Sequence, residues 1–170
     1  GGAGLVVVEA TAVAPEGREG RLEGDRDLLA SLRIMESSDA ADWLELAVTR
    51  NYVAELDRLQ GRYAEAALLL ERLVEEATAR LGEEHPQVHY FINNLAGIYR
   101  DQERFDEAQT LLHRSLALRR AAAEPDTQAI ARATLNLAEL CRLQGRYSDA
   151  EPLYLEALDL ARQAWGGQSG

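Results

Sequence analysis

Four asparagines recur at a regular spacing in this 170-residue chain, and their side chains could recognise a peptide. The step from Asn51 to Asn93 is the same as the step from Asn94 to Asn136. Asparagine is a mediocre helix former, so its repetition at equivalent helical positions requires a reason. An amide can both donate to and accept from a peptide backbone, as a groove that holds an extended segment requires. Two interpretations stay open: the amides bind a peptide, or they bridge adjacent helices.

Other residues of catalytic or metal-binding type are present, but their surroundings favour structural roles. His85 and His89 are four residues apart, which on a helix could place two metal ligands on one face. However, Pro86 follows His85, and proline is favoured at the first position of a helix. Cys141 lies in an apolar column and pairs with no obvious base, and the sequence has no phosphate-binding loop. We therefore expect no catalytic residue, no metal site and no cofactor.

The elements that must position these residues are indicated by one short phrase that occurs three times. The copies are Gln60-Gly61-Arg62-Tyr63-Ala64-Glu65-Ala66, Gln102-Glu103-Arg104-Phe105-Asp106-Glu107-Ala108 and Gln144-Gly145-Arg146-Tyr147-Ser148-Asp149-Ala150. The copies follow one another at a constant 42-residue step, which is also the step between the paired asparagines. A fixed period of this size is typical of repeat proteins, whose functions lie on extended surfaces.

Apolar residues on either side of the phrase are spaced three, four and seven apart, which indicates helices. The phrase itself predicts a tight turn, with Gly61 and Gly145 suited to a left-handed backbone. Each unit is therefore predicted to be a helix, a turn and a second helix. The predicted helices lie near 40–59, 62–80, 86–101, 104–121, 127–143 and 146–164.

Two further columns indicate how the helices pack. Small residues are predicted to face each other across each hairpin, namely Ala54, Ala96 and Ala138 against Ala66, Ala108 and Ala150. The aromatic column of Tyr63, Phe105 and Tyr147 is predicted to fill the wedge where one hairpin meets its neighbour. On that basis Tyr147→Ala is expected to cost about 3–5 kcal/mol of stability.

The pattern resembles the tetratricopeptide repeat family, and in particular its 42-residue subtype found in kinesin light chains and bacterial scaffold proteins. The resemblance is carried by His85-Pro86, by Asn93 to Tyr99 and by Gly145 to Tyr154, and it covers about residues 43–165. It implies an all-α, right-handed superhelix of three helical-hairpin repeats over residues 39–165. A capping helix or half repeat over 21–38, near 24–37 as a helix, is expected before them, with a flexible tail at 166–170.

In this family the first helix of each hairpin lines a concave groove, where asparagines hold the backbone of a bound peptide. The matching positions here are Asn51, Tyr52, Glu55, Tyr90, Asn93, Asn94, Arg132, Leu135, Asn136 and Glu139, with Arg58, Arg100 and Arg142 at the edge. The resemblance implies a non-catalytic scaffold that binds a peptide or helix of another protein. The alternative is a regulatory or oligomerisation fragment of a larger signalling or enzyme-bearing chain, and self-association through exposed repeat ends is a further expectation.

Residues 1–18 resemble a barrel strand and loop of the flavin-dependent old yellow enzyme family. The likeness ends at Arg18, and a barrel needs about 200 residues or more, so we expect no flavin chemistry and an irregular segment over 1–20.

The net charge of −11 argues against nucleic acid and anionic membranes as partners, because both favour basic surfaces. All 18 basic residues are arginine, the single cysteine excludes an intrachain disulfide, and no apolar run approaches the roughly 20 residues that cross a bilayer. We expect a cytoplasmic, bacterial protein.

Overall fold

The computed structural model describes residues 28–30, 32–33 and 42–166, and within these ranges every regular element is a helix. The complete helices are α2 (Trp43–Leu59), α3 (Tyr63–Leu81), α4 (Pro86–Asp101), α5 (Phe105–Ala121), α6 (Thr127–Leu143) and α7 (Tyr147–Gly166). Each predicted helix end lies within three residues of the observed one. Residues 28–30 and 32–33 are helical and fall inside the predicted capping helix, whereas the rest of that prediction, residues 1–20 and residues 167–170 lie outside the described residues.

Side chains fix where the first helix of each hairpin begins. The Asp42 carboxylate accepts a hydrogen bond from the Leu44 amide, and the Asp126 carboxylate accepts one from Ala129. At the start of α4 the same role falls to His85, whose Nδ1 accepts from the amide of Gln87 at 3.1 Å. Each bond satisfies an amide that the helix leaves without a partner. His85 is therefore a helix cap, as the His-Pro pair predicts.

The three turns inside the hairpins share one backbone geometry. Arg62, Arg104 and Arg146 each donate their amide to the carbonyl five residues back, at 2.8, 2.8 and 2.9 Å. This bond closes a Schellman motif, which requires a left-handed residue just after the helix. Gly61 and Gly145 have φ of 79° and 73°, as predicted. In the middle turn Glu103 takes the same conformation, with φ of 60°.

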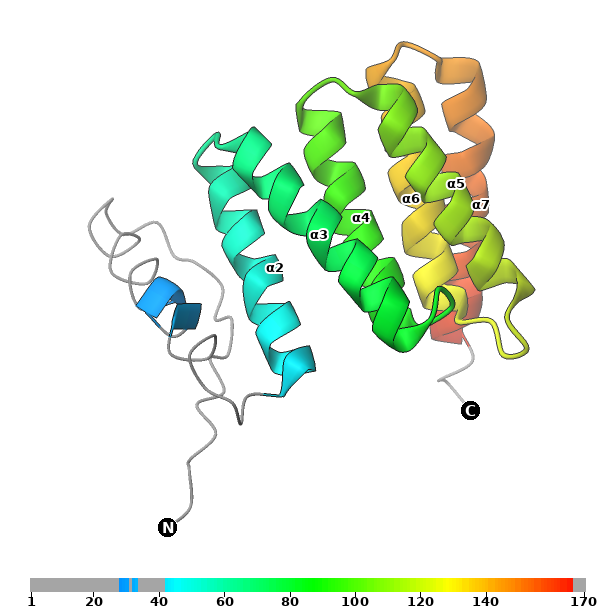
Figure 1. Ribbon diagram of the computed structural model, residues 1–170. Coiled ribbons are helices and arrows are strands. Elements are labelled where there is room, and N and C mark those ends of the chain that lie inside the picture. Colours follow the sequence, from blue (N-terminus) through cyan, green and yellow to red (C-terminus); the bar gives the residue numbers. More distant parts are fainter. Residues whose placement is uncertain (1–27, 31, 34–41, 167–170) are drawn as a thin grey trace.

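The helices form three hairpins, α2–α3, α4–α5 and α6–α7, which stand side by side in a row (Figure 1). Each helix packs against its neighbours in the chain, and α4 also contacts α2 and α6. We call the packing of α4 against the first hairpin the first junction, and that of α6 against the second hairpin the second junction. The six alanines expected to face each other within the hairpins are all buried. An all-α solenoid of helical hairpins is thus confirmed.

The aromatic column is filled less uniformly than its spacing predicts. Phe105 is half-buried and lies beside Gln144, in the turn of the next hairpin. Tyr147 occupies the same column in the third hairpin, yet 68% of its surface is exposed. No hairpin of the described chain follows α7, so nothing there covers this ring. The predicted burial of Tyr147 is therefore wrong, and the large stability cost expected from removing it loses its physical basis.

None of the described helices combines the length and the apolar character that crossing a bilayer requires.

Candidate peptide-binding groove

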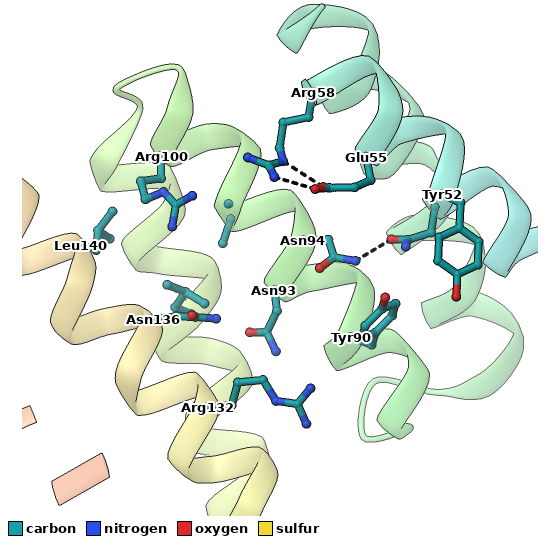
Figure 2. Close-up of a pocket in the computed structure, with 14 residues that line it drawn as sticks. Tyr52, Glu55, Arg58, Tyr90, Asn93, Asn94, Arg100, Arg132, Asn136 and Leu140 are labelled. Atoms are coloured by element: carbon teal, nitrogen blue, oxygen red, sulfur yellow. Dashed lines mark hydrogen bonds and ion pairs between the residues drawn. The ribbon is translucent and has the colours of Figure 1, made fainter. Parts of the chain in front are cut away.

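A cavity of about 410 Å³ opens on the side where α2, α4 and α6 lie next to each other. Figure 2 shows side chains from these three helices converging on it. Eight of the ten predicted groove residues line the cavity: Asn51, Tyr52, Glu55, Tyr90, Asn93, Asn94, Arg132 and Asn136. Tyr52 and Tyr90 present exposed rings, so the cavity offers both apolar and polar contacts. The register of the repeat thus brings most of the predicted set into one place.

At the first junction the amides are used within the fold. Asn94 Nδ2 donates to Asn51 Oδ1 at 2.8 Å, which links α4 to α2 (Figure 2). Asn51 is only 2% exposed, so its oxygen is satisfied by Asn94 and not by solvent. A buried amide without such a partner would cost about 1–3 kcal/mol. Bridging, the second of the two interpretations that the sequence leaves open, is therefore the role of this pair.

At the second junction the equivalent amide side chains do not form a hydrogen bond with each other. Asn93 and Asn136 stand in the same two columns as Asn51 and Asn94, yet no hydrogen bond joins them among the described residues. Asn93 Oδ1 is buried and accepts no hydrogen bond from any residue that the structure describes. An unpaired buried acceptor is uncommon in a folded protein and calls for a donor. Both side chains line the cavity, so a molecule inside it could supply one.

Most of the arginines around the cavity are neutralised by the chain itself. Arg58 Nε lies 2.8 Å from Glu55, and another nitrogen of its guanidinium lies 2.5 Å from Asp101 on α4. Arg100 contacts the same Asp101 at 2.9 Å. The hydrogen bond to Glu55 is the main cause that raises the pKa of Arg58, so this guanidinium stays charged. At this end of the groove the positive charges of two arginines are therefore balanced by the negative charges of two carboxylates.

Arg132 differs from the other three predicted arginines because it makes no ion pair with any described residue. It is exposed, lines the cavity from α6 and extends toward α4 (Figure 2). Desolvation is the main cause that lowers the pKa of Arg119, the charge of Asp126 acts against it, and the positive charge of Arg132 lowers the pKa further. The groove therefore owes its available positive charge to Arg132.

The remaining two predicted residues lie outside this cavity. Leu135 lines a second cavity between α6 and α7. Glu139 accepts hydrogen bonds from Arg142 Nε at 2.8 Å and from the Tyr154 hydroxyl at 2.7 Å. These bonds, that from Arg142 first, lower the pKa of Glu139 to about 2. Glu139 and Arg142 thus form an ion pair within α6, outside the cavity.

Sequence reasoning did not assign the floor of the cavity, which contains Ala96, Leu112 and Leu140. Ala96 and Leu140 belong to apolar columns that the repeat identifies, but their position beneath a groove depends on how α4, α5 and α6 cross. His89 and Ser115 are a further buried polar pair, with Nδ1 and Oγ 3.0 Å apart. Burial is the main cause that lowers the pKa of His89 to about 4. No group of three or more metal-ligating side chains occurs within the described ranges.

Comparison with known proteins agrees with this geometry. Family models described as the tetratricopeptide repeat match residues 46–87 and residues 89–163. These parts of the chain are tetratricopeptide repeats. Proteins with such repeats generally mediate contacts between proteins, and the fold is of a non-enzymatic scaffold type. No curated protein matches the sequence significantly.

Two solved structures share the fold. The crystal structure of BtubC (BKLC) from P. vanneervenii is 23% identical, with a TM-score of 0.72 over 89% of this chain and 60% of that one. A crystal structure of a Podosopora anserina putative kinesin light chain with nearly identical TPR-like repeats is 20% identical, with a TM-score of 0.70 over 86% and 69%. The chain thus spans 60% of the length of the first of these proteins.

The resemblance of residues 1–18 to the old yellow enzyme family is not supported. The matching family models lie within residues 46–163, and the similar structures are repeat proteins. Residues 1–18 themselves lie outside the described residues.

Proposed function

We propose that this repeat protein is a scaffold whose groove binds a segment of another protein, extended or helical, with an acidic residue beside an apolar anchor. The observation that carries the proposal is the second junction, where Asn93 Oδ1 is buried without a partner and Arg132 has no ion pair among the described residues. The first is a buried acceptor without a donor, and the second is an exposed cation that is available to an anionic group of a ligand.

The roles follow from the chemistry of each side chain. Asn93 and Asn136 hold the backbone of the bound segment, because amides both accept and donate. Arg132 contacts its carboxylate through the planar guanidinium. Tyr52 and Tyr90 supply the apolar contact, since aromatic side chains provide large and rigid contact areas. The remaining arginines contribute less, because a carboxylate of the chain already neutralises each of them.

Selection of peptides from a displayed random library, using the purified chain, tests this function. We expect the enriched sequences to carry Asp or Glu within a few residues of an aromatic or aliphatic side chain. A labelled peptide from that pool should bind Arg132→Ala more weakly than the unaltered chain by about tenfold or more, because hydrogen bonds to charged groups contribute about 1.5–3 kcal/mol. Asn93→Ala combined with Asn136→Ala should reduce binding further.

Arg142→Ala is the matched control, because Arg142 is also an exposed α6 arginine but lies outside the cavity and pairs with Glu139. It should leave the affinity for the peptide nearly unchanged. If Arg132→Ala and Arg142→Ala reduce the affinity for the peptide equally, the groove does not recognise the acidic residue of the peptide through Arg132. Undiminished binding to the double asparagine variant would exclude the amides as the backbone contacts.

A further inference from the structure

One residue that lines the groove, Gly97, is of an unfavourable type for its position. It lies inside α4 and on the wall of the 410 Å³ cavity. After proline, glycine is the least favourable residue in a helix interior, because it loses the most conformational freedom on folding. Gly97 has no positive φ, unlike Gly61 and Gly145, and a Cβ added to it would meet no atom from elsewhere in the described chain within 4 Å. Neither the backbone nor the packing therefore requires glycine here.

The neighbouring units carry a long side chain at the same repeat position. The equivalents of Gly97 are Glu55 on α2 and Glu139 on α6, and each forms an ion pair with the arginine three residues later. Arg100 stands in that arginine column, but it contacts Asp101 instead. The middle unit thus lacks the carboxylate of its neighbours, and this part of the cavity stays open.

The open space above α4 suits the backbone of a ligand. Glycine is typical of places where another backbone comes close. Asn93 lies one turn before Gly97 on the same face of α4, and its Oδ1 accepts no hydrogen bond from any described residue. The N–H groups inside a helix are already bonded to carbonyls four residues back, so a helical ligand would offer this oxygen only side chains. An extended segment has free N–H groups, and the pair of Asn93 and Gly97 therefore favours it.

We propose, on the basis of the groove function above, that Gly97 selects an extended segment, whose backbone lies against α4 at this glycine and donates an N–H group to Asn93. The groove function by itself allows an extended or a helical ligand, and Gly97 decides between them. A side chain at this position would hold the backbone of the ligand away from α4 and lengthen the hydrogen bond to Asn93. Gly97 is thus a specificity-determining residue that lowers the stability of α4 and admits the ligand.

Gly97→Ala separates this role from a structural one, because stability and binding should change in opposite directions. Urea unfolding should show a higher midpoint, since alanine is the best helix former and the added methyl group meets no neighbour. Fluorescence anisotropy with the labelled peptide selected on the unaltered chain should show binding weakened by about tenfold. Thr110→Ala is the matched control, because Thr110 is exposed on α5 outside the cavity, and alanine is the better helix former there too. It should leave the affinity unchanged.

Gly97→Gln is the stronger test of the space above α4. It adds an uncharged side chain as long as the glutamates of the neighbouring units, so the fold should accept it and an acidic ligand is not repelled. We expect it to weaken binding more than Gly97→Ala does, with helicity retained in circular dichroism. A lower unfolding midpoint for Gly97→Ala, or binding that neither variant weakens, would overturn the proposal.

Methylation of the peptide backbone nitrogens, one position at a time, tests whether the ligand is extended. Successive N–H groups of an extended segment point to opposite sides, so methylation should weaken binding at alternate positions. One of these positions should lose its effect in Asn93→Ala, because the acceptor is then absent. Weakened binding at every consecutive interior position would indicate a helix and contradict the proposal.

The same measurements separate this proposal from the groove function on which it rests. If both Gly97 variants bind the peptide as the unaltered chain does while Arg132→Ala binds it weakly, the groove function holds and the role of Gly97 fails. If Arg132→Ala and the double asparagine variant bind normally, or if the library yields no peptide, the groove function fails and this proposal fails with it.

Discussion

The two junctions are built from the same columns of the repeat, yet one is closed and the other is open. At the first, Asn51 and Asn94 bond to each other, and Arg58 reaches from α2 to Asp101 on α4. At the second, Asn93 keeps an unpaired oxygen, and Arg132 has no ion pair with any described residue. The same residue type at the same repeat position can therefore stabilise the fold in one unit and remain available for a ligand in the next.

The largest expected effect tests the packing that closes the first junction. Phe91 is fully buried and lies three residues before Asn94, on the same face of α4. Its equivalent on α6 is Ala133, so Phe91→Ala gives α4 the smaller side chain that α6 carries. We expect a loss of about 3–5 kcal/mol in the free energy of unfolding, measured with urea. Leu68→Ala, at an exposed position of α3, should change it by about 0.5 kcal/mol or less. A similarly small change for Phe91→Ala would contradict its place in the packed core.

The next effect depends on pH and concerns the contact between α4 and α5. His89 on α4 is buried against Ser115 on α5, and its pKa is lowered from 6.5 to about 4, mainly by burial and then by Arg119. Above pH 6.5 the imidazole is neutral in both states, so it imposes no penalty. As the pH falls to about 4, the unfolded chain gains the proton first, and stability falls by up to about 3 kcal/mol.

His89→Asn removes the titrating group and keeps a side chain that can bond to Ser115. Urea unfolding between pH 7 and pH 4 should show a shallower loss of stability for this variant than for the unaltered chain. Parallel curves would show that His89 does not cause the acid sensitivity. The charge of Glu83 and a backbone hydrogen bond with Glu84 act in the opposite direction and raise the pKa of His89, so they reduce the loss that burial and Arg119 cause.

The smallest of the three effects compares the two amide columns directly. Asn51→Ala leaves the Asn94 amide at the first junction without its acceptor, and we expect a loss of about 1–3 kcal/mol in the free energy of unfolding. Asn93→Ala removes an acceptor that has no partner, so stability should stay within about 0.5 kcal/mol or rise. Thermal or urea unfolding of both variants decides the matter. An equal loss of unfolding free energy in the two variants would mean that the asparagine side chains stabilise both junctions to the same extent.

The sequence predicts the helices, the turns and the buried alanines well, because each follows from local spacing that recurs in every unit of the repeat. It does not distinguish the two asparagine pairs, since hydrogen bonding between helices depends on small differences in how α4 and α6 cross their neighbours. The sequence also does not predict the exposure of Tyr147. The repeat alignment shows that an aromatic residue occupies this position in every unit, but it does not show whether another hairpin covers the ring. Glu103 in a glycine column shows a similar limit, since the surrounding helices impose its left-handed backbone.

Because each helix packs mainly against its neighbours along the chain, almost every stabilising contact spans a short stretch of sequence. Chains with such local contacts fold fast, and in repeat arrays stability divides into contributions from single units and the interfaces between them. Opening can then begin at either end without disturbing the middle. Among the described helices, amide hydrogen exchange should therefore be slowest in α4 and α5, which have a hairpin on each side, and faster in the two outer hairpins. The protein would behave as a row of coupled segments, and a ligand bound across α4 and α6 would slow the opening of the third hairpin.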